Sequence, residues 1–212
     1  MGAGVEREIK LSATPGFVLP DLSDLAGGEV HDSGVEPLET VYWDTDALDA
    51  ARRGFGLRHR RRLDRPDGPG VWTLKTPGRL DGDLMVRGEH EIPAPADAPP
   101  DPLLEMLPSG VPRSALHPVA VLRASRRVLT VPGAGGPGVE VMDDTVEVVA
   151  ADGSIAERFR ELEVEVADGG DQLAGRVAAR LREAGAGPRE SASKYGRALR
   201  ALGHPVTGIP EL

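Results

Sequence analysis

The chain has 212 residues, no cysteine and a formal net charge of −9. These totals exclude a disulfide framework, a thiolate nucleophile and a cysteine-ligated zinc site, and they argue against a general nucleic-acid-binding protein. No apolar run approaches the roughly 20 residues of a membrane-spanning helix, and the first residues lack a basic and apolar leader, so we expect a cytoplasmic protein without a membrane partner.

Alternation of polar and apolar residues, broken by turn residues, predicts eight strands of an antiparallel sheet or barrel. The expected strands cover residues 5–11, 39–44, 57–63, 71–76, 85–92, 119–131, 139–149 and 159–166. Helical segments are expected near 21–25 and over 47–53, 103–107, 172–184 and 191–202. We expect one α+β, mainly β domain over residues 1–203, followed by a tail or linker over 204–212.

Charged residues occupy one face of most of these strands, because alternate residues of a strand point the same way. The rows are Glu6, Glu8 and Lys10 on the first strand, Arg58, Arg60 and Arg62 on the third, Arg87, Glu89 and Glu91 on the fifth, and Glu161, Glu163 and Glu165 on the last. One interpretation is a solvated outer face with cross-strand ion pairs, and the other is a closed barrel with the charges inside. Like charges in a row repel one another unless an oppositely charged group neutralises them, which favours the barrel with a bound ligand.

A charged barrel interior would suit a complex of a metal ion with a polyphosphate. Guanidinium groups grip phosphate oxygens in a bidentate way. Carboxylates are the oxygen ligands that Mg²⁺ and Mn²⁺ prefer, and these ions also bridge to phosphates.

The motifs on these strands resemble those of the CYTH domain, or triphosphate tunnel metalloenzyme, superfamily, in the same order and over about residues 5–200. They are EREIK at 6–10, YWDT at 42–45, LRHR at 57–60, WTLKTP at 72–77, RGEHEI at 87–92, DDTV at 143–146, FRELEVEV at 159–166 and SKYGRAL at 193–199. Of the 25 basic residues only three are lysines, and all three (Lys10, Lys75 and Lys194) fall within these motifs.

The resemblance implies an eight-stranded antiparallel β-barrel, flanked by a few helices, that hydrolyses a triphosphate in a charged tunnel with Mg²⁺ or Mn²⁺. The implied metal ligands are Glu6, Glu8, Asp144, Glu161 and Glu163. The implied phosphate-binding residues are Lys10, Arg58, Arg60, Lys75, Arg87, Arg123, Arg127 and Lys194. Catalytic roles are expected for Glu8, Lys10 and Glu163.

The sixth strand departs from the family pattern, which often has two basic residues two positions apart. Arg123 fits the first position, but Ser125 occupies the second. Arg127 shares the face of Arg123 and is expected to replace the missing contact, whereas Arg126 is expected to point away unless a bulge intervenes.

Three functions are compatible with this sequence. The first is hydrolysis of inorganic triphosphate, or of nucleoside or thiamine triphosphate. The second is a non-catalytic polyphosphate-binding module, because the family also occurs fused to a helical CHAD domain associated with polyphosphate, and the residues after Leu202 resemble a linker to such a downstream domain. The third is a class IV type adenylate cyclase, which ranks last because no base-reading feature is visible.

Overall fold

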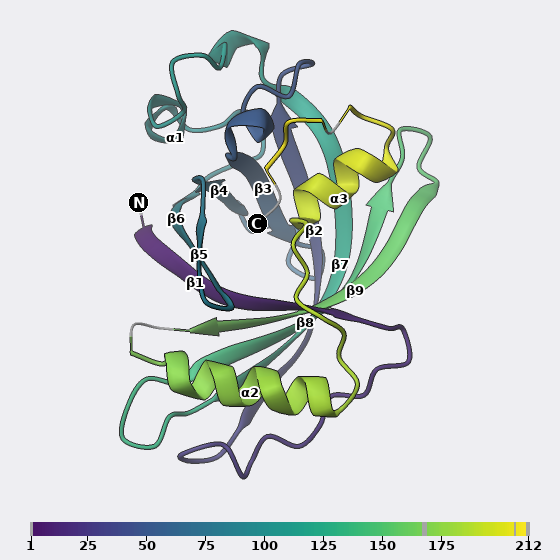
Figure 1. Ribbon diagram of the computed structural model, residues 1–212. Helices are drawn as coiled ribbons and strands as arrows, with labels where there is room; N and C mark the ends of the chain where they lie inside the picture. Colours follow the sequence, from purple (N-terminus) through teal and green to yellow (C-terminus); the bar gives the residue numbers. More distant parts are fainter. Residues whose placement is uncertain (1, 167–168, 206, 211–212) are drawn as a thin grey trace.

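The computed structural model describes residues 2–166, 169–205 and 207–210, and its strands close into an antiparallel β-barrel (Figure 1). Within the described residues the strands are β1 (Gly2–Ala13), β2 (His31–Asp44), β3 (Gly56–Arg62), β4 (Val71–Lys75), β5 (Arg79–Asp81), β6 (Leu84–Pro93), β7 (His117–Val131), β8 (Val139–Val149) and β9 (Ile155–Val166). Their order is β1-β9-β8-β7-β2-β3-β4-β6, and β6 pairs again with β1 to close the ring. The short β5 pairs only with β6, outside the ring. The expected eight-stranded barrel is therefore confirmed, with one additional strand.

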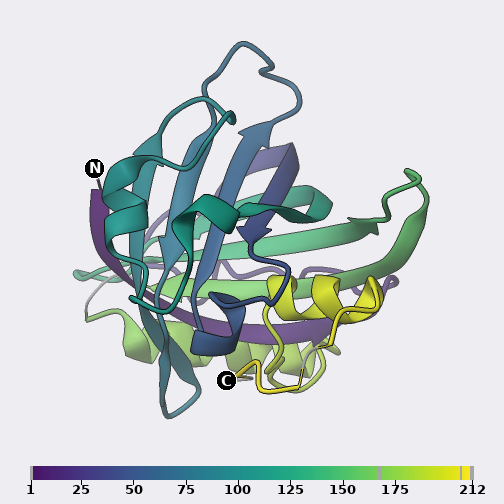
Figure 2. The same ribbon diagram turned by 90° about the horizontal axis from the view of Figure 1, so that it is seen from above.

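Strand β1 forms the seam of the barrel. Its residues 2–8 pair with β6 and its residues 8–13 pair with β9, so that Glu8 lies opposite both Met85 and Glu165. Figure 2 shows β1, in purple, sweeping along one side of the barrel. The inward-facing row Glu6, Glu8 and Lys10 consequently lies at the place where the two halves of the sheet meet.

Helix α2 (Asp171–Glu183) covers the outer face of β1 and β9. Its apolar residues recur at the helical spacing predicted from the sequence, and they pack against the outward side chains of both strands. This part of the core includes Ile9, Leu11, Leu162, Val164, Leu173, Val177 and Leu181. Because the outward side chains of β1 and β9 form this core, the charged side chains of the two strands lie on their inner faces.

A second apolar cluster covers the outer face of β3, β4 and β6. Helix α1 (Asp101–Glu105) and the residues that follow it pack there on Trp72, which is fully buried. Short 3-10 turns lie at Ala51–Arg53 and Arg113–Ala115. Helices α1 and α2 both lie outside the barrel, so they stabilise its wall without filling its interior.

Helix α3 (Lys194–Ala201) packs against a third apolar cluster at the inner faces of β2, β7, β8 and β9. Figure 1 shows α3 beside β2 and β7, with the strands between it and α2. The Ser193 hydroxyl caps its first turn by accepting a hydrogen bond from the Gly196 N–H. The aromatic ring of Tyr195 stacks on that of Tyr42 at 4.4 Å. The first residue of the helix, Lys194, is thus held against the barrel interior.

Two helical expectations were wrong. Residues 21–25 form turns, because the Asp21 carboxylate accepts the Ser23 N–H and so competes with a helical hydrogen-bond pattern. The segment 47–53 is helical only in the 3-10 turn Ala51–Arg53. None of the described helices is long and apolar enough to cross a lipid bilayer.

The predicted tail partly folds back on the barrel. The Arg52 guanidinium donates hydrogen bonds to the carbonyl oxygens of Pro205 and Thr207, and Ile209 packs on the apolar cluster beneath α3. The domain boundary at residue 203 stays a prediction, and residues 206, 211 and 212 of the predicted tail lie outside the described residues.

Candidate functional site

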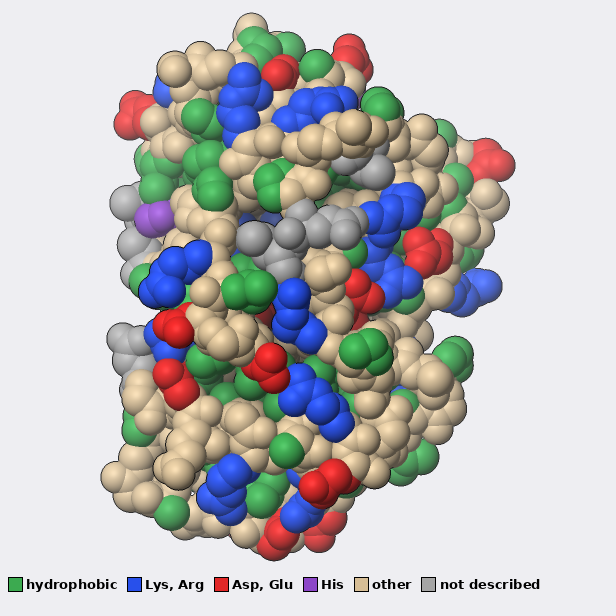
Figure 3. All heavy atoms as spheres, viewed as in Figure 1, with side chains coloured by type: hydrophobic (Ala, Val, Ile, Leu, Met, Phe, Trp, Pro, Cys, Tyr) green, Lys and Arg blue, Asp and Glu red, His purple; other side chains and the backbone are tan. Residues whose placement is uncertain are grey.

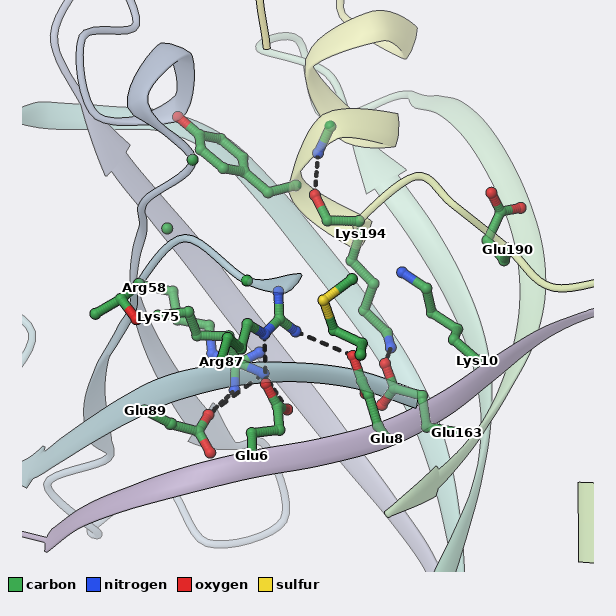
Figure 4. A pocket seen from close by; sticks show the side chains of 18 of the residues that line it. Glu6, Glu8, Lys10, Arg58, Lys75, Arg87, Glu89, Glu163, Glu190 and Lys194 are labelled. Carbon is green, nitrogen blue, oxygen red and sulfur yellow. Dashed lines mark hydrogen bonds and ion pairs between the residues drawn. The ribbon is translucent and has the colours of Figure 1, made fainter. Parts of the chain in front are cut away.

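A cavity of about 320 Å³ lies inside the barrel, and every strand of the ring contributes to its lining, together with α3 (Figure 4). Of the residues predicted to form the site, those that line it are Glu6, Glu8, Lys10, Arg58, Arg60, Lys75, Arg87, Glu163 and Lys194. Asp144 and Glu161 are buried in the wall beside it and are ion-paired to Lys194. Side chains from distant parts of the sequence therefore converge as the inward charge rows predicted.

Glu6 is the centre of one ion-pair group. Its Oε1 lies 2.5 Å from Lys75 Nζ and its Oε2 lies 2.5 Å from Arg87 Nε. Arg87 stands directly opposite Glu6 across the β1–β6 pairing, which explains the short contact. Burial raises the pKa of Glu6, but Lys75 and Arg87 outweigh it and lower that pKa to about 2. Glu6 is therefore a stable carboxylate at neutral pH.

Glu8, one step further along β1, has the opposite character. Its only ion pair among the described residues is with Arg87, at 3.1 Å. Burial, and then the neighbouring charges of Glu163 and Glu6, raise the pKa of Glu8 to about 7. A carboxyl group with that pKa can give up or accept a proton near neutral pH.

The second ion-pair group, which we call the Lys194 cluster, consists of Lys194, Arg126, Asp144, Glu161 and Glu163. Lys194 Nζ lies 2.5 Å from Glu161, 2.7 Å from Glu163 and 3.0 Å from Asp144. Arg126 contacts the two oxygens of Asp144 at 2.8 and 2.6 Å and reaches Glu163 at 3.2 Å. The two cations leave the three carboxylates partly neutralised, and one Glu161 oxygen, Oε2, is buried without a hydrogen-bond partner.

Two guanidinium groups of β3, Arg58 and Arg60, lie in the cavity close to Arg126 of the Lys194 cluster. Arg60 donates to the Thr40 hydroxyl at 3.2 Å and has no ion pair with any carboxylate of the described residues. Burial, and then the nearby charges of Arg58 and Arg126, lower the pKa of Arg60 to about 9. The Arg58 guanidinium reaches Glu89 at 3.5 Å, while its buried Nε lacks a hydrogen-bond partner. This concentration of positive charge is suited to an anion with several negative charges.

Lys10 lines the cavity and donates a 2.6 Å hydrogen bond to the Ala192 carbonyl oxygen, just before α3. It forms no ion pair with the carboxylates of the described residues. Its position beside the Lys194 cluster follows from the β1–β9 pairing, in which Lys10 lies opposite Glu163. Its charge is therefore free to meet an anion.

The structure does not bring Arg123 and Arg127 to the cavity, and the expected orientation of Arg126 was wrong. Arg123 and Arg127 project outward, where they pair with Glu39 at 3.5 Å and Asp32 at 2.6 Å. Arg126 projects inward instead, without a bulge in the β7–β8 pairing.

Arg126 points inward because side chains alternate between the inner and the outer face along β7. Ala120 and Leu122 are buried against the α3 side of the interior, and alternate positions carry that inner face on to Arg126. Ala120 and Leu122 are apolar in the sequence, but Val119 and Val121 make the opposite face equally apolar. The sequence alone therefore does not show which face of β7 points inward. Arg126 is thus a cavity residue that sequence reasoning missed, as are Glu140, Arg189 and Glu190.

The donor set fits a hard divalent cation by its chemistry, because the converging groups are carboxylates and one buried oxygen of Glu161 has no partner. In the described part of the chain, however, no three His, Asp or Glu side chains are arranged ready to hold a metal ion. The reason is visible in the distances: Lys194 and Arg126 already occupy the space among the oxygens.

Comparisons with known proteins agree with this geometry. The sequence matches the CYTH domain family over residues 5–195. The uncharacterized protein Rv2226 of Mycobacterium tuberculosis is 32% identical over 213 aligned residues, which cover 93% of this chain and 40% of that protein. The chain therefore spans about 40% of the length of the curated relatives that it matches.

Solved structures share the fold. HpAC1 from Hippeastrum matches with a TM-score of 0.58 and 20% identity, covering 96% of this chain and 98% of its own. PH1819 from Pyrococcus horikoshii matches with a TM-score of 0.56 and 22% identity, covering 92% and 98%. At these identities the likeness concerns the architecture alone.

Proposed function

Because this chain belongs to the CYTH domain family, we propose that it is a metal-dependent triphosphatase that hydrolyses inorganic triphosphate inside the barrel. The observation that carries this proposal is the juxtaposition, in one cavity, of partly neutralised carboxylates with Arg60, whose guanidinium group has no ion pair with a carboxylate of the described residues, and with the nearby Arg58 and Arg126. Phosphoryl transfer depends mainly on positioning and charge neutralisation, which such a cavity supplies. HpAC1, which shares the fold, is described as having a dominant triphosphatase activity, and this supports the same reaction class.

The phosphate chain would be held by cations that line the cavity. Arg60 has no carboxylate partner among the described residues, Arg58 reaches Glu89 only at 3.5 Å, and Lys10 presents its ammonium near Glu163. Arg126 lies close to Arg60 and also pairs with Asp144. A bound triphosphate would relieve the mutual repulsion of Arg58, Arg60 and Arg126, and this relief favours its binding. Arg123 and Arg127, on the outside, have no part in this binding.

The residues that would hold Mg²⁺ or Mn²⁺ are Glu6, Asp144, Glu161 and Glu163, and Glu8, which the resemblance also implied as a ligand, is kept for proton transfer. When bound, such an ion neutralises phosphate charge and polarises the terminal phosphoryl group.

Glu8 is the residue we assign to proton transfer, because its pKa near 7 suits a general base at neutral pH. Its carboxylate accepts the proton of the water that attacks the terminal phosphorus. The bond from that phosphorus to the bridging oxygen breaks, and phosphate and diphosphate leave. Glu163 and Lys10 flank Glu8 on the same inner face and orient the water and the phosphate.

Binding of polyphosphate without turnover is the second candidate, and one observation favours it: the carboxylates of the Lys194 cluster are already paired with cations of the protein. A substrate panel separates the possibilities. The protein is incubated with inorganic triphosphate, ATP or thiamine triphosphate, with Mg²⁺, Mn²⁺ or EDTA, and phosphate, diphosphate and cyclic AMP are measured. We expect phosphate release that is fastest with inorganic triphosphate and absent in EDTA. Tight polyphosphate binding without any turnover would support the binding module, and cyclic AMP formation would support the cyclase.

A further inference from the structure

Lys194 has a different role in this structure from the phosphate contact implied by the family resemblance. An ammonium group has three N–H donors. Lys194 directs its Nζ at Glu161, Glu163 and Asp144, at 2.5, 2.7 and 3.0 Å. The side chain is 9% exposed, so water does not share these contacts to any great extent. Two of its donors are used in hydrogen bonds to Glu161 and Glu163, and the ammonium is also ion-paired with Asp144, so Lys194 is engaged by carboxylates rather than free for a phosphate oxygen.

The position of Nζ is the one that a cation bound by these carboxylates would take. The three oxygens come from β8 and β9, and all of them lie within 3.0 Å of the ammonium nitrogen. The partner carboxylates are almost completely buried, with Glu161 at 0% and Asp144 at 1% exposure. Buried carboxylates of this kind need a positive partner, because leaving them unpaired is strongly unfavourable. Either Lys194 or a divalent cation can satisfy that need, but both cannot occupy one place.

We propose that Lys194 is a built-in competitor of the divalent cation, and that the cation binds among Asp144, Glu161 and Glu163 only when the Lys194 ammonium withdraws. This inference rests on the proposed metal-dependent function. It adds that metal binding and phosphate binding are coupled through one side chain, because a withdrawn Lys194 regains its donors.

The structure provides for a movement of the side chain rather than of the helix. Helix α3 is fastened by the stacking of Tyr195 on Tyr42, by the Tyr195–Asp44 hydrogen bond at 3.0 Å, and by the Arg197–Glu157 ion pair at 2.6 Å. Lys194 itself lines the 320 Å³ cavity, which offers room for its four-carbon chain to turn away from the carboxylates. The withdrawn ammonium would then face the same space as the phosphates, which accounts for both roles of Lys194.

The first test measures Mn²⁺ binding without substrate, by the electron paramagnetic resonance signal of free Mn²⁺. Lys194→Met removes the competitor, so we expect its affinity for Mn²⁺ to be roughly tenfold higher than that of the wild type, within the usual range of coupling between two ligands. Lys10→Met is the matched control, because it removes an equal charge from the same cavity while Lys10 contacts only a carbonyl oxygen. It should tighten binding much less. Unchanged or weaker binding by Lys194→Met, or equal tightening in both variants, would overturn the inference.

The second test uses the wild type and does not depend on the folding of a variant. The three lysines are acetylated under mild conditions, and the extent at each is read by mass spectrometry of peptides, with and without Mg²⁺. We expect Lys194 to be shielded without Mg²⁺ and to become reactive with Mg²⁺ alone, while Lys10 changes little. A Lys194 that stays shielded at saturating Mg²⁺ contradicts the inference.

The outcomes also separate this inference from the proposed function. If Lys194→Met binds Mn²⁺ more tightly and Mg²⁺ exposes Lys194 to acetylation, but no triphosphate is hydrolysed, the proposed triphosphatase function is refuted. The proposed competition between Lys194 and the cation is then supported. An active protein whose Lys194 stays shielded refutes only the competition. A wild type and a Lys194→Met variant that both bind no Mn²⁺ refute the two proposals together.

Discussion

Arg60 and Arg123 are the same residue type in opposite surroundings. Arg60 lies half-buried in the cavity beside Arg58 and Arg126, whereas Arg123 lies on the outer face near Glu39. Burial and the charges of Arg58 and Arg126 make the charged form of Arg60 unfavourable. Arg123 lies at the surface, where an ion pair contributes little to stability. We therefore expect the two positions to respond differently to the same substitution.

Arg60→Ala should weaken triphosphate binding by roughly 10- to 100-fold, because it removes charge-assisted hydrogen bonds to phosphate. It should leave the free energy of unfolding without ligand unchanged or raise it, since the repulsion from Arg58 and Arg126 is relieved. Calorimetric titration with triphosphate and urea unfolding measure the two effects. Arg123→Ala is the control and should alter neither quantity appreciably. Equal loss of affinity in the two variants would refute the assignment of Arg60.

The glutamates of the cavity predict how stability depends on pH in EDTA. Burial, together with neighbouring acidic groups, raises the pKa values of Glu8 and Glu165 to about 7 from an ordinary value of 4.5. Between these values the folded state holds more protons than the unfolded state, so stability falls as pH rises from about 5 to about 8. Glu6, with a lowered pKa of about 2, stabilises the fold throughout this interval and loses that contribution only in strong acid.

Urea unfolding at pH 5, 6, 7 and 8 in EDTA tests this dependence. The free energy of unfolding should decrease steadily across the series, and Glu8→Gln should reduce the slope because its side chain does not titrate. A wild-type stability that is constant or increases over these pH values would contradict the assigned surroundings of Glu8.

At the scale of elements, helix α3 is positioned by one buried carboxylate. Asp44 accepts the Tyr195 hydroxyl at 3.0 Å and also the N–H groups of Thr45, Ala50 and Ala51 at 2.8 to 2.9 Å. It therefore joins the end of β2, the 3-10 turn and α3, and it fixes where Lys194 enters the cavity. A group that accepts four hydrogen bonds is unfavourable to disturb.

Tyr195→Phe should lower the free energy of unfolding by about 1 to 3 kcal/mol, because a buried charged acceptor loses a donor while the ring stacking is kept. Tyr42→Phe is the matched control. The Tyr42 hydroxyl has no hydrogen-bond partner among the residues that the structure describes, so its removal should cost much less. Urea unfolding of both variants gives the comparison. Similar losses in the two variants would show that Asp44 does not anchor the helix through Tyr195.

The strands could be predicted from the sequence because each one alternates clearly between a charged and an apolar side. The charge rows of β1, β3, β6 and β9 predicted the inner face, and their members line or adjoin the cavity except Arg62, which pairs with Glu36 and Asp64 beyond it. Strand β5 was not predicted, because three residues are too few to show a period. On β7 both sides are apolar at its start, so the facing of Arg123, Arg126 and Arg127 depended on the family pattern and was assigned wrongly.

The partners of the charged residues could not be predicted in the same way. Lys194 meets Glu161 only because α3 docks at the inner face of β9, and that docking depends on contacts far apart in the sequence. The family motif identified Lys194 as a site residue. Its pairing with carboxylates, and the unpaired state of Arg60, required the three-dimensional arrangement.

The whole molecule separates two kinds of charged surface. Figure 3 shows acidic and basic side chains interspersed over one face of the exterior. Inside the barrel, the carboxylates of β1 and β9 lie among cations from other elements: Lys75 and Arg87 pair with Glu6, and Arg126 pairs with Glu163. A closed barrel brings these groups together, because every inward position faces the same enclosed space. The carboxylates and the guanidinium groups together create a site for a phosphate chain with its cation.

The central claim is tested most directly by following inorganic triphosphate with ³¹P NMR in the presence of the protein and Mg²⁺. The triphosphate signals should be replaced by those of phosphate and diphosphate. Glu8→Gln should slow this conversion by at least ~100-fold, as expected for loss of a general base, while triphosphate binding is retained. Glu147→Gln, on the outer side of β8 in an exposed ion pair with Arg158, is the matched control and should react like the wild type. Triphosphate signals that shift on binding but persist unconverted in the wild type, or a Glu8→Gln variant with full activity, would contradict the account.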